Sequence, residues 1–102
     1  TGIESGQLKI LNIYNYPNPF LTTTQFSFEI TKKADLEIDI FTLSGRKIKH
    51  LKYADANAGF KIVDWNGKDI YGGEIAKGVY LYRIKATSDN STVSHIGKCA
   101  KY

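Results

Sequence analysis

The chain has 102 residues and a formal net charge of +4, and 42% of its residues are hydrophobic and 24% charged. The length fits one domain, and the apolar content excludes an intrinsically disordered segment. No apolar run approaches the about 20 residues of a membrane-spanning helix, so we expect no direct membrane span. The chain begins with Thr1 and contains no methionine, so we expect it to be a processed or excised part of a longer protein.

Seven short segments carry the signals of β-strands: apolar and polar residues in alternation, or β-branched and aromatic runs bounded by turn residues. In chain order these predicted strands lie at residues 8–14, 25–30, 35–40, 48–51, 60–65, 79–86 and 93–99. Residues 1–7 are expected to be a loose lead-in. No segment shows a sustained helical period. The pattern predicts an all-β fold, a seven-stranded antiparallel β-sandwich over residues 8–102.

Two of the predicted strands depart from simple alternation. Phe60 and Ile62 point to one face of their strand while Val63 and Trp65 point to the other, so we expect a β-bulge or a change of neighbours there. Residues 79–86 are the most continuous apolar strand, which suits a central position in a sheet.

The turns between the strands have their own signals. Residues 32–35 are expected to form a hairpin turn, and Gly45 supplies the positive φ of a tight turn at residues 44–45. Residues 70–78 form a longer loop rich in glycine, and residues 89–90 are expected to close the final hairpin.

The sequence offers no pattern that supports catalysis. Its two histidines, His50 and His95, lie in predicted strands with no nucleophile motif beside them. One cysteine, Cys99, and two well-separated histidines provide no close pair of zinc ligands. We therefore expect that this domain is not an enzyme, and that it has no metal site and no cofactor.

Three binding alternatives follow from local composition. Asp64, Asn66, Asp69 and Glu74 place oxygen ligands around a glycine-bearing turn, as a calcium site would. Hydrogen bonds from these side chains to the backbone of their own turn are the favoured interpretation. The basic run at residues 46–50 suggests nucleic acid, but its apolar interruptions favour a solvated strand face, and we expect no nucleic-acid partner.

An aromatic platform for sugars is the third alternative. It would consist of Trp65 with Tyr80 and Tyr82, which lie in two predicted strands. A tryptophan in a strand of a sandwich is more often part of the core, because burial of its ring contributes several kcal/mol. We therefore expect Trp65 to be mostly buried and packed with Tyr80 or Tyr82.

Four motifs follow one another along nearly the whole chain. They are Tyr16-Pro17-Asn18-Pro19-Phe20, Leu43-Ser44-Gly45-Arg46, Trp65-Asn66-Gly67-Lys68-Asp69 and Gly78-Val79-Tyr80-Leu81-Tyr82-Arg83. In this order they resemble the C-terminal sorting domain of proteins exported by the type IX secretion system of Bacteroidetes-type bacteria. That family has a fibronectin- or immunoglobulin-like β-sandwich, which is also related to the Ig-like domain of the flagellar hook-capping protein.

The resemblance implies a sorting and attachment domain of a secreted protein that reaches the bacterial cell surface through the periplasm. Its implied partners are outer-membrane proteins of type IX secretion and attachment. The motif residues that carry the resemblance are Tyr16, Pro17, Asn18, Pro19, Phe20, Gly45, Trp65, Gly67, Asp69, Gly78 and Tyr80.

The last strand is the implied docking element, because a strand at the edge of a sheet offers unpaired N–H and C=O groups to a partner. The residues expected to bind a partner are Ile96, Gly97, Lys98, Cys99, Ala100, Lys101 and Tyr102. The end of the chain keeps two lysines typical of the family but replaces the aliphatic pair between them by Cys99 and Ala100. Three alternatives remain: the uncleaved C-terminal domain of the cell-surface sortase component, a structural Ig-like module of hook-capping type, and a carbohydrate-binding module.

Overall fold

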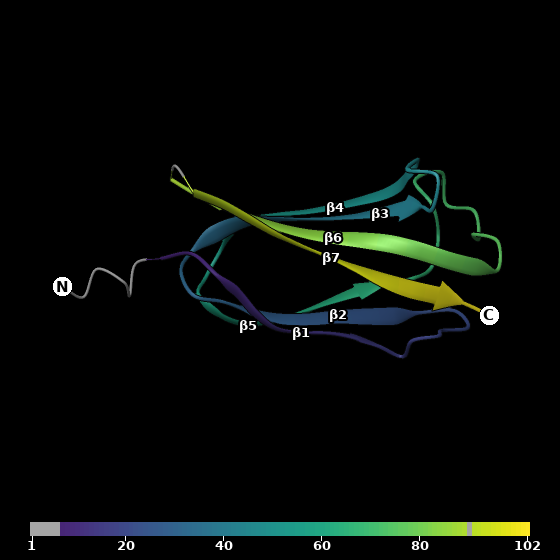
Figure 1. The fold of residues 1–102 in the computed structure, drawn as a ribbon, viewed down its shortest axis with the longest axis horizontal. Coiled ribbons are helices and arrows are strands. Elements are labelled where there is room, and N and C mark those ends of the chain that lie inside the picture. Colours follow the sequence, from purple (N-terminus) through teal and green to yellow (C-terminus); the bar gives the residue numbers. More distant parts are fainter. Residues whose placement is uncertain (1–6, 90) are drawn as a thin grey trace.

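The computed structural model describes residues 7–89 and 91–102, and within these ranges it contains seven β-strands and no helix. The strands are β1 (Ile10–Tyr16), β2 (Thr24–Ile30), β3 (Ala34–Thr42), β4 (Lys47–Ala56), β5 (Gly59–Trp65), β6 (Gly78–Ser88) and β7 (Ser91–Lys101). They form two antiparallel sheets that lie one above the other (Figure 1). The predicted seven-stranded antiparallel sandwich is confirmed. Among the described residues nothing helical is present that could cross a membrane.

The two sheets differ in size. The smaller sheet has the order β1-β2-β5 and the larger sheet the order β4-β3-β6-β7, so β6 is an interior strand, as predicted. The chain passes from the smaller to the larger sheet between β2 and β3. The hairpin expected at residues 32–35 is therefore wrong, because this segment connects the layers. The tight turn at residues 44–45 is confirmed, since β3 and β4 pair on either side of it and Gly45 has a φ of 96°.

The core lies between the sheets and consists of the inward positions of the alternating strands. Successive side chains of a strand point to opposite faces, so an alternating sequence buries every second residue. The three apolar residues predicted for β2 and the three predicted for β3 are all buried: Phe26, Phe28, Ile30, Leu36, Ile38 and Ile40. Tyr80, Tyr82 and Ile84 of β6, next to β3 in the larger sheet, are buried on the same side of the core.

β5 has no bulge. It pairs with β2 in an unbroken register from Gly59 to Trp65, so the irregularity expected from the sequence is wrong. Val63 and Trp65 point into the core, while Phe60 and Ile62 lie on the outer face and are 61% and 57% exposed. The alternation of inward and outward side chains is regular. The sequence indicated a bulge because both faces of β5 carry large apolar side chains.

Candidate docking site at the C-terminal strand

Residues 16–20, called the edge segment below, lie along the outer edge of the second half of β7. The backbone N–H of Phe20 donates to the carbonyl oxygen of Ala100 at 2.9 Å, and the N–H of Tyr102 donates to the carbonyl oxygen of Phe20 at 2.9 Å. These bonds form an isolated parallel bridge between Phe20 and Lys101. The end of β7 is therefore hydrogen-bonded on both sides, to β6 and to the edge segment.

The side chain of Asn18 extends this pairing in the manner of a peptide group. Its Nδ2 donates to the carbonyl oxygen of Lys98, and its Oδ1 accepts from the N–H of Ala100, both at 3.0 Å. Asparagine carries a donor and an acceptor in one planar group, so it satisfies two backbone groups of an edge strand at once. The residue is separated from its partners by 80 and 82 positions in the sequence.

The side chain of Phe20 packs into the core and so holds the edge segment in place. Its ring is buried and meets the ring of Trp65 edge-on, with 5.5 Å between the centroids. The Lys101 ammonium lies 5.9 Å from the Phe20 ring centroid and donates to the carbonyl oxygen of Leu21 at 2.5 Å. The ring contact and the cation–π contact hold the same side chain from two directions. Trp65 is buried, as predicted, and its aromatic contact is with Phe20.

The turn after β5 supports Trp65 through its backbone. The indole Nε1 of Trp65 donates to the carbonyl oxygen of Lys68 at 2.9 Å. Gly67 has a φ of 72°, and a Cβ at this position would collide with the carbonyl oxygen of Thr22. Only glycine combines that backbone conformation with so close an approach. The glycine of this motif is therefore required by the fold.

The polar side chains of the same loop hydrogen-bond to their own turn. Asp69 Oδ1 accepts from the N–H groups of Tyr71 and Gly73, both at 2.9 Å. Asn66 Oδ1 accepts from the N–H of Lys68 at 3.1 Å. These bonds confirm, for Asn66 and Asp69, the interpretation that was favoured over a calcium site.

Tyr80 closes the same end of the sandwich. Its hydroxyl donates to the carbonyl oxygen of Ala76 at 2.6 Å, and its ring is buried. Trp65 and Tyr82 are buried as well, so the sugar platform proposed from these three rings is wrong. The rings contribute apolar area to the core. Motifs that are far apart in sequence thus meet around the second half of β7.

The residues predicted to bind a partner divide into inward and outward sets. Cys99 is buried, and a Cβ at Gly97 would lie 2.5 Å from the ring of Tyr82, so these two positions face the core. Ile96, Lys98 and Tyr102 are exposed on the outer side. The division follows from the alternation of β7, which faces the core at one residue in two.

The first half of β7 has a free edge within the part of the chain that the structure describes. β7 pairs with β6 without a register shift, from Ser91 opposite Ser88 to Lys101 opposite Gly78. Backbone groups of a strand alternate between its two edges. Those of Thr92, Ser94 and Ile96 therefore point to the same side as the groups that meet the edge segment further on. They have no backbone partner among residues 7–89 and 91–102.

Because Cys99 is buried, the reactivity of its thiol reports whether the edge segment holds β7 in place. Burial raises the pKa of the Cys99 thiol to about 11, so its reactive thiolate is scarce at neutral pH. We expect slow labelling of Cys99 by a thiol reagent in the native protein. Asn18→Ala removes two hydrogen bonds that hold the strand, so labelling should become about tenfold faster.

The measurement is the rate of disulfide exchange with a coloured aromatic disulfide at pH 8. Asn57→Ala, a change at an exposed loop position, is the control and should leave the rate unchanged. Equal rates in the two variants would mean that Asn18 does not hold β7 in place.

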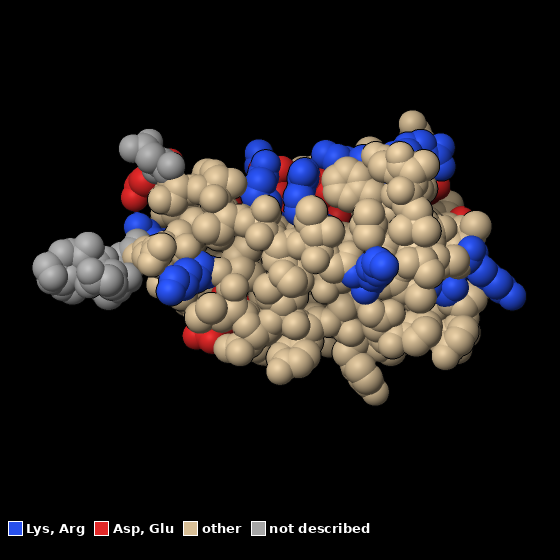
Figure 2. All heavy atoms as spheres, in the orientation of Figure 1, with Lys and Arg blue, Asp and Glu red and all other residues tan. Residues whose placement is uncertain are grey.

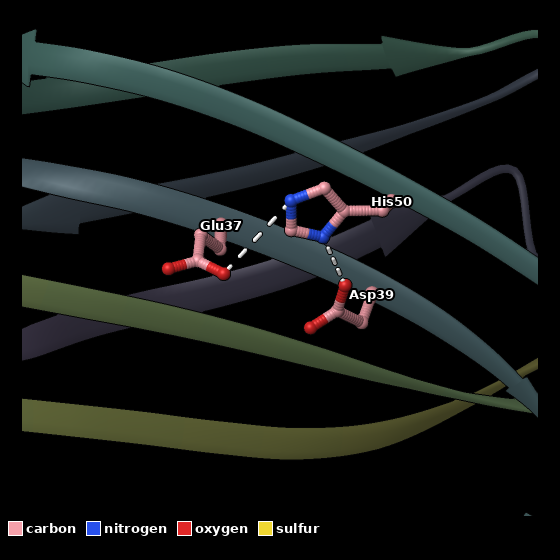
Figure 3. Close-up of side chains that lie close together, drawn as sticks. All are labelled: Glu37, Asp39 and His50. Carbon is pink, nitrogen blue, oxygen red and sulfur yellow. Dashed lines mark hydrogen bonds and ion pairs between the residues drawn. The ribbon is translucent and has the colours of Figure 1, made fainter. Parts of the chain in front are cut away.

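A second cluster of polar residues lies on the larger sheet (Figure 3). Asp39 is buried, and its carboxylate accepts a hydrogen bond from Nδ1 of His50 at 2.5 Å and from Nη2 of Arg83 at 2.9 Å. Glu37 lies 3.9 Å from Nε2 of the same histidine. Pairing of β3 with β4 places Asp39 opposite His50. This cluster was not predicted from the sequence, although the hairpin register set by the turn at residues 44–45 indicates it.

Glu37, Asp39 and His50 have the atoms of a metal site, but their surroundings disfavour a cation. The Lys47 ammonium lies 3.5 Å from Asp39, and the Lys85 ammonium 3.6 Å from Glu37. These charges repel a metal ion and already neutralise the carboxylates. Burial alone would raise the pKa of Asp39, but hydrogen bonds from His50 and Arg83 outweigh it and hold the pKa below its ordinary value. We interpret the cluster as an ion-pair network.

Comparison with known proteins gives one family and several structures of the same fold. The model of the FlgD Ig-like domain family matches residues 16–90. No match was found among curated proteins. The crystal structure of dimeric latent PorU from Porphyromonas gingivalis superimposes with a TM-score of 0.77 and 20% identity, over 94% of this chain and 10% of that chain.

Two further structures share the fold. FlgD from Xanthomonas campestris, a protein of hook capping in flagellar assembly, has a TM-score of 0.63 and 19% identity, over 93% of this chain and 67% of that one. PorZ is described as an essential surface component of the type-IX secretion system of P. gingivalis. It has a TM-score of 0.59 and 21% identity, over 89% of this chain and 11% of that chain. This chain thus spans about a tenth of the PorU and PorZ chains. At these identities the likeness shows the fold alone.

Proposed function

This chain belongs to the family of FlgD Ig-like domains, and on that premise we propose that it is a C-terminal sorting and cell-surface attachment domain of a protein exported by type IX secretion. The ordered motifs from Tyr16 to Arg83 support the proposal. So does the shared fold with PorZ, a surface component of that system. In this role the domain is not catalytic. It acts at the outer membrane, by binding to proteins of the secretion and attachment machinery.

The observation that carries the proposal is the asymmetry of β7. Its second half is enclosed by the edge segment, while the outward backbone groups of its first half have no backbone partner among residues 7–89 and 91–102. This first half leads into the exposed Ile96 and Lys98. A partner would add a strand along residues 92–96 and so extend the larger sheet. The exposed Lys98 ammonium at the end of this edge favours an acidic partner surface.

The other exposed edges are better protected against a foreign strand. β4 carries Lys47, Lys49 and Lys52, and β5, the other edge of the smaller sheet, carries Lys61 and Asp64. β1 has a register shift between Leu11 and Tyr14. Lysines and bulges are devices that prevent strand addition. Residues 91–97 contain no lysine, acidic residue or proline. The first half of β7 is therefore the edge most open to strand addition.

Ser94→Pro tests this docking mode, because the N–H of Ser94 points outward and proline there breaks no bond with β6. We expect a fusion of residues 8–102 to a periplasmic reporter to reach the surface of a type IX-competent host. Ser94→Pro should reduce surface display at least tenfold, with the reporter accumulating in the periplasm. The measurement is protease accessibility of the reporter on intact cells.

Ser94→Ala is the matched control and should be displayed normally, since it leaves the backbone edge open. Circular dichroism of each purified domain establishes that it is folded. If Ser94→Pro is displayed as well as Ser94→Ala, strand addition at this edge is wrong. If the unaltered folded fusion stays periplasmic, the sorting function itself is wrong.

A structural Ig-like module of hook-capping type is the second candidate, favoured by the match to FlgD over 93% of this chain. It becomes the better proposal if the unaltered fusion is not exported. Whether the domain is retained, as in the uncleaved sortase component, or removed is decided by the mass of the displayed fusion. Retention adds the mass of residues 8–102 to the surface product.

A further inference from the structure

The outer face of the smaller sheet is covered by aromatic and aliphatic side chains. Tyr14 and Tyr16 of β1 are 65% and 76% exposed, and Phe60 and Ile62 of β5 lie across the same face. In Figure 2 the lower side, where Figure 1 places β1 and β2, is largely free of charged side chains, and the lysines and arginines gather towards the upper side. The two faces of the sandwich thus have different chemistry.

Strand pairing arranges this face in rows. Tyr16 lies beside Gln25 of β2, which lies beside Asp64 of β5. The next row holds Tyr14, Ser27 and Ile62. Directly opposed residues of antiparallel strands point to the same face, so the Tyr16 ring stands next to the Gln25 amide, and the Asp64 carboxylate follows one strand further along the row. Residues two apart in one strand are separated by about 7 Å, so the tyrosines form two adjacent stacking positions.

An open cavity of about 540 Å³ lies at the end of the first row. It is lined by Tyr16, Gln25, Asp64 and Asn66, with parts of the loops on either side. This volume is within the range of small-ligand sites. The side chains of Gln25 and Asp64 make no hydrogen bond or ion pair with any described residue. Their polar atoms are available to a ligand.

We propose that these residues, Tyr14, Tyr16, Gln25 and Asp64, called the tyrosine shelf, bind a neutral saccharide chain. The apolar face of a sugar ring would stack on a tyrosine, whose ring is rigid and flat. Two neighbouring hydroxyls would donate to the Asp64 carboxylate, which accepts at both oxygens, and the Gln25 amide would donate to or accept from a third. A chain of two or more units is favoured, because the stacking positions follow one another along β1.

The charges on the shelf select against acidic ligands. The charged side chains in its rows are Asp64 and, one row beyond Tyr14, Glu29, and both are negative. They would repel a polyanion such as nucleic acid or a sulfated glycan, although the whole chain has a net charge of +4. The tyrosine shelf lies on the smaller sheet, whereas the free edge of β7 belongs to the larger one, so this inference is independent of the proposed sorting function.

The experiment is a titration of the ¹⁵N-labelled domain with three probes: maltohexaose, cellohexaose and mannohexaose. We expect at least one of them to shift the amide signals of the tyrosine shelf in a saturable way. Tyr16→Ala and Asp64→Asn should each weaken that binding at least tenfold. Tyr71→Ala is the matched control, since Tyr71 is highly exposed but lies outside the shelf, and it should bind as the unaltered domain does.

The spectrum of each variant without sugar shows whether it is folded. Binding that Tyr16→Ala leaves intact in a folded domain would overturn the proposal. So would the absence of saturable shifts with all three probes, tighter binding of heparin at the same residues, or self-association through the shelf in place of sugar binding.

Discussion

Replacing Trp65 by alanine is expected to lower the free energy of unfolding by about 3–5 kcal/mol, a large part of the stability of a domain of this size. The indole ring is 2% exposed, so its removal leaves a cavity in the core. The same change removes the edge-on contact with Phe20, which holds the edge segment against β7. The loss should therefore combine cavity formation with loosening of the C-terminal strand.

Urea unfolding of the two proteins, followed by circular dichroism, measures the difference. Phe60→Ala is the matched control, because it removes an aromatic ring from the same strand but from the outer face. The free energy of unfolding of that variant should fall by less than about 1 kcal/mol. Similar losses in both variants would contradict the assignment of Trp65 as the core contact of the edge segment.

The layers of the fold could be predicted from the sequence because a strand has a period of two. Phe26 and Phe28 are predicted and observed to be buried, and the same holds for the alternating residues of β3 and β6. The connection at residues 32–35 could not be predicted, because a hairpin and a crossing between sheets use the same turn residues. Strand order depends on contacts between distant segments, which a local pattern does not contain.

The surroundings of the candidate docking strand could be predicted only in part. The sequence indicated the last strand, but the pairing of Asn18 with Lys98 and Ala100 joins residues about 80 positions apart and leaves no periodic signal. Consequently the protection of the second half of β7 was not expected, nor was the restriction of its free edge to residues 92–96. The tyrosine shelf could not be predicted for a related reason. Its rows of side chains form only when β1 and β5 pair with β2.

The burial of Asp39 could not be predicted from the sequence either. The sequence predicted this residue on the polar face of its strand, and the structure places it there, opposite His50 and Arg83. The side chains of Arg83, Lys47 and His50 cover the carboxylate, so a residue on the outer face becomes almost inaccessible. Alternation predicts which face a side chain occupies, but the lengths of its neighbours decide whether water reaches it.

Asp39→Ala is expected to lower the free energy of unfolding by about 2–3 kcal/mol at neutral pH. Removal of one partner from a buried ion pair leaves the other charges uncompensated and costs about 3–5 kcal/mol. Here the side chains around Asp39 are partly exposed, Arg83 at 33%, His50 at 35% and Lys47 at 48%, so water lowers the loss. Asp64→Ala, at an exposed carboxylate without such partners, is the control and should change stability by about 0.5 kcal/mol or less.

The effect of Asp39 should depend on pH in a defined direction. Its partners hold the pKa of Asp39 below its ordinary value, so the ionised carboxylate stabilises the fold above the pKa of the unfolded chain, about 3.9. That contribution is lost as the pH falls through the lower pKa of the folded state. The stability difference between the unaltered domain and Asp39→Asn should therefore narrow as the pH falls below about 4. Urea unfolding at a series of pH values measures it, and a difference that stays constant down to about pH 2 would show that ionisation of Asp39 does not stabilise the sheet.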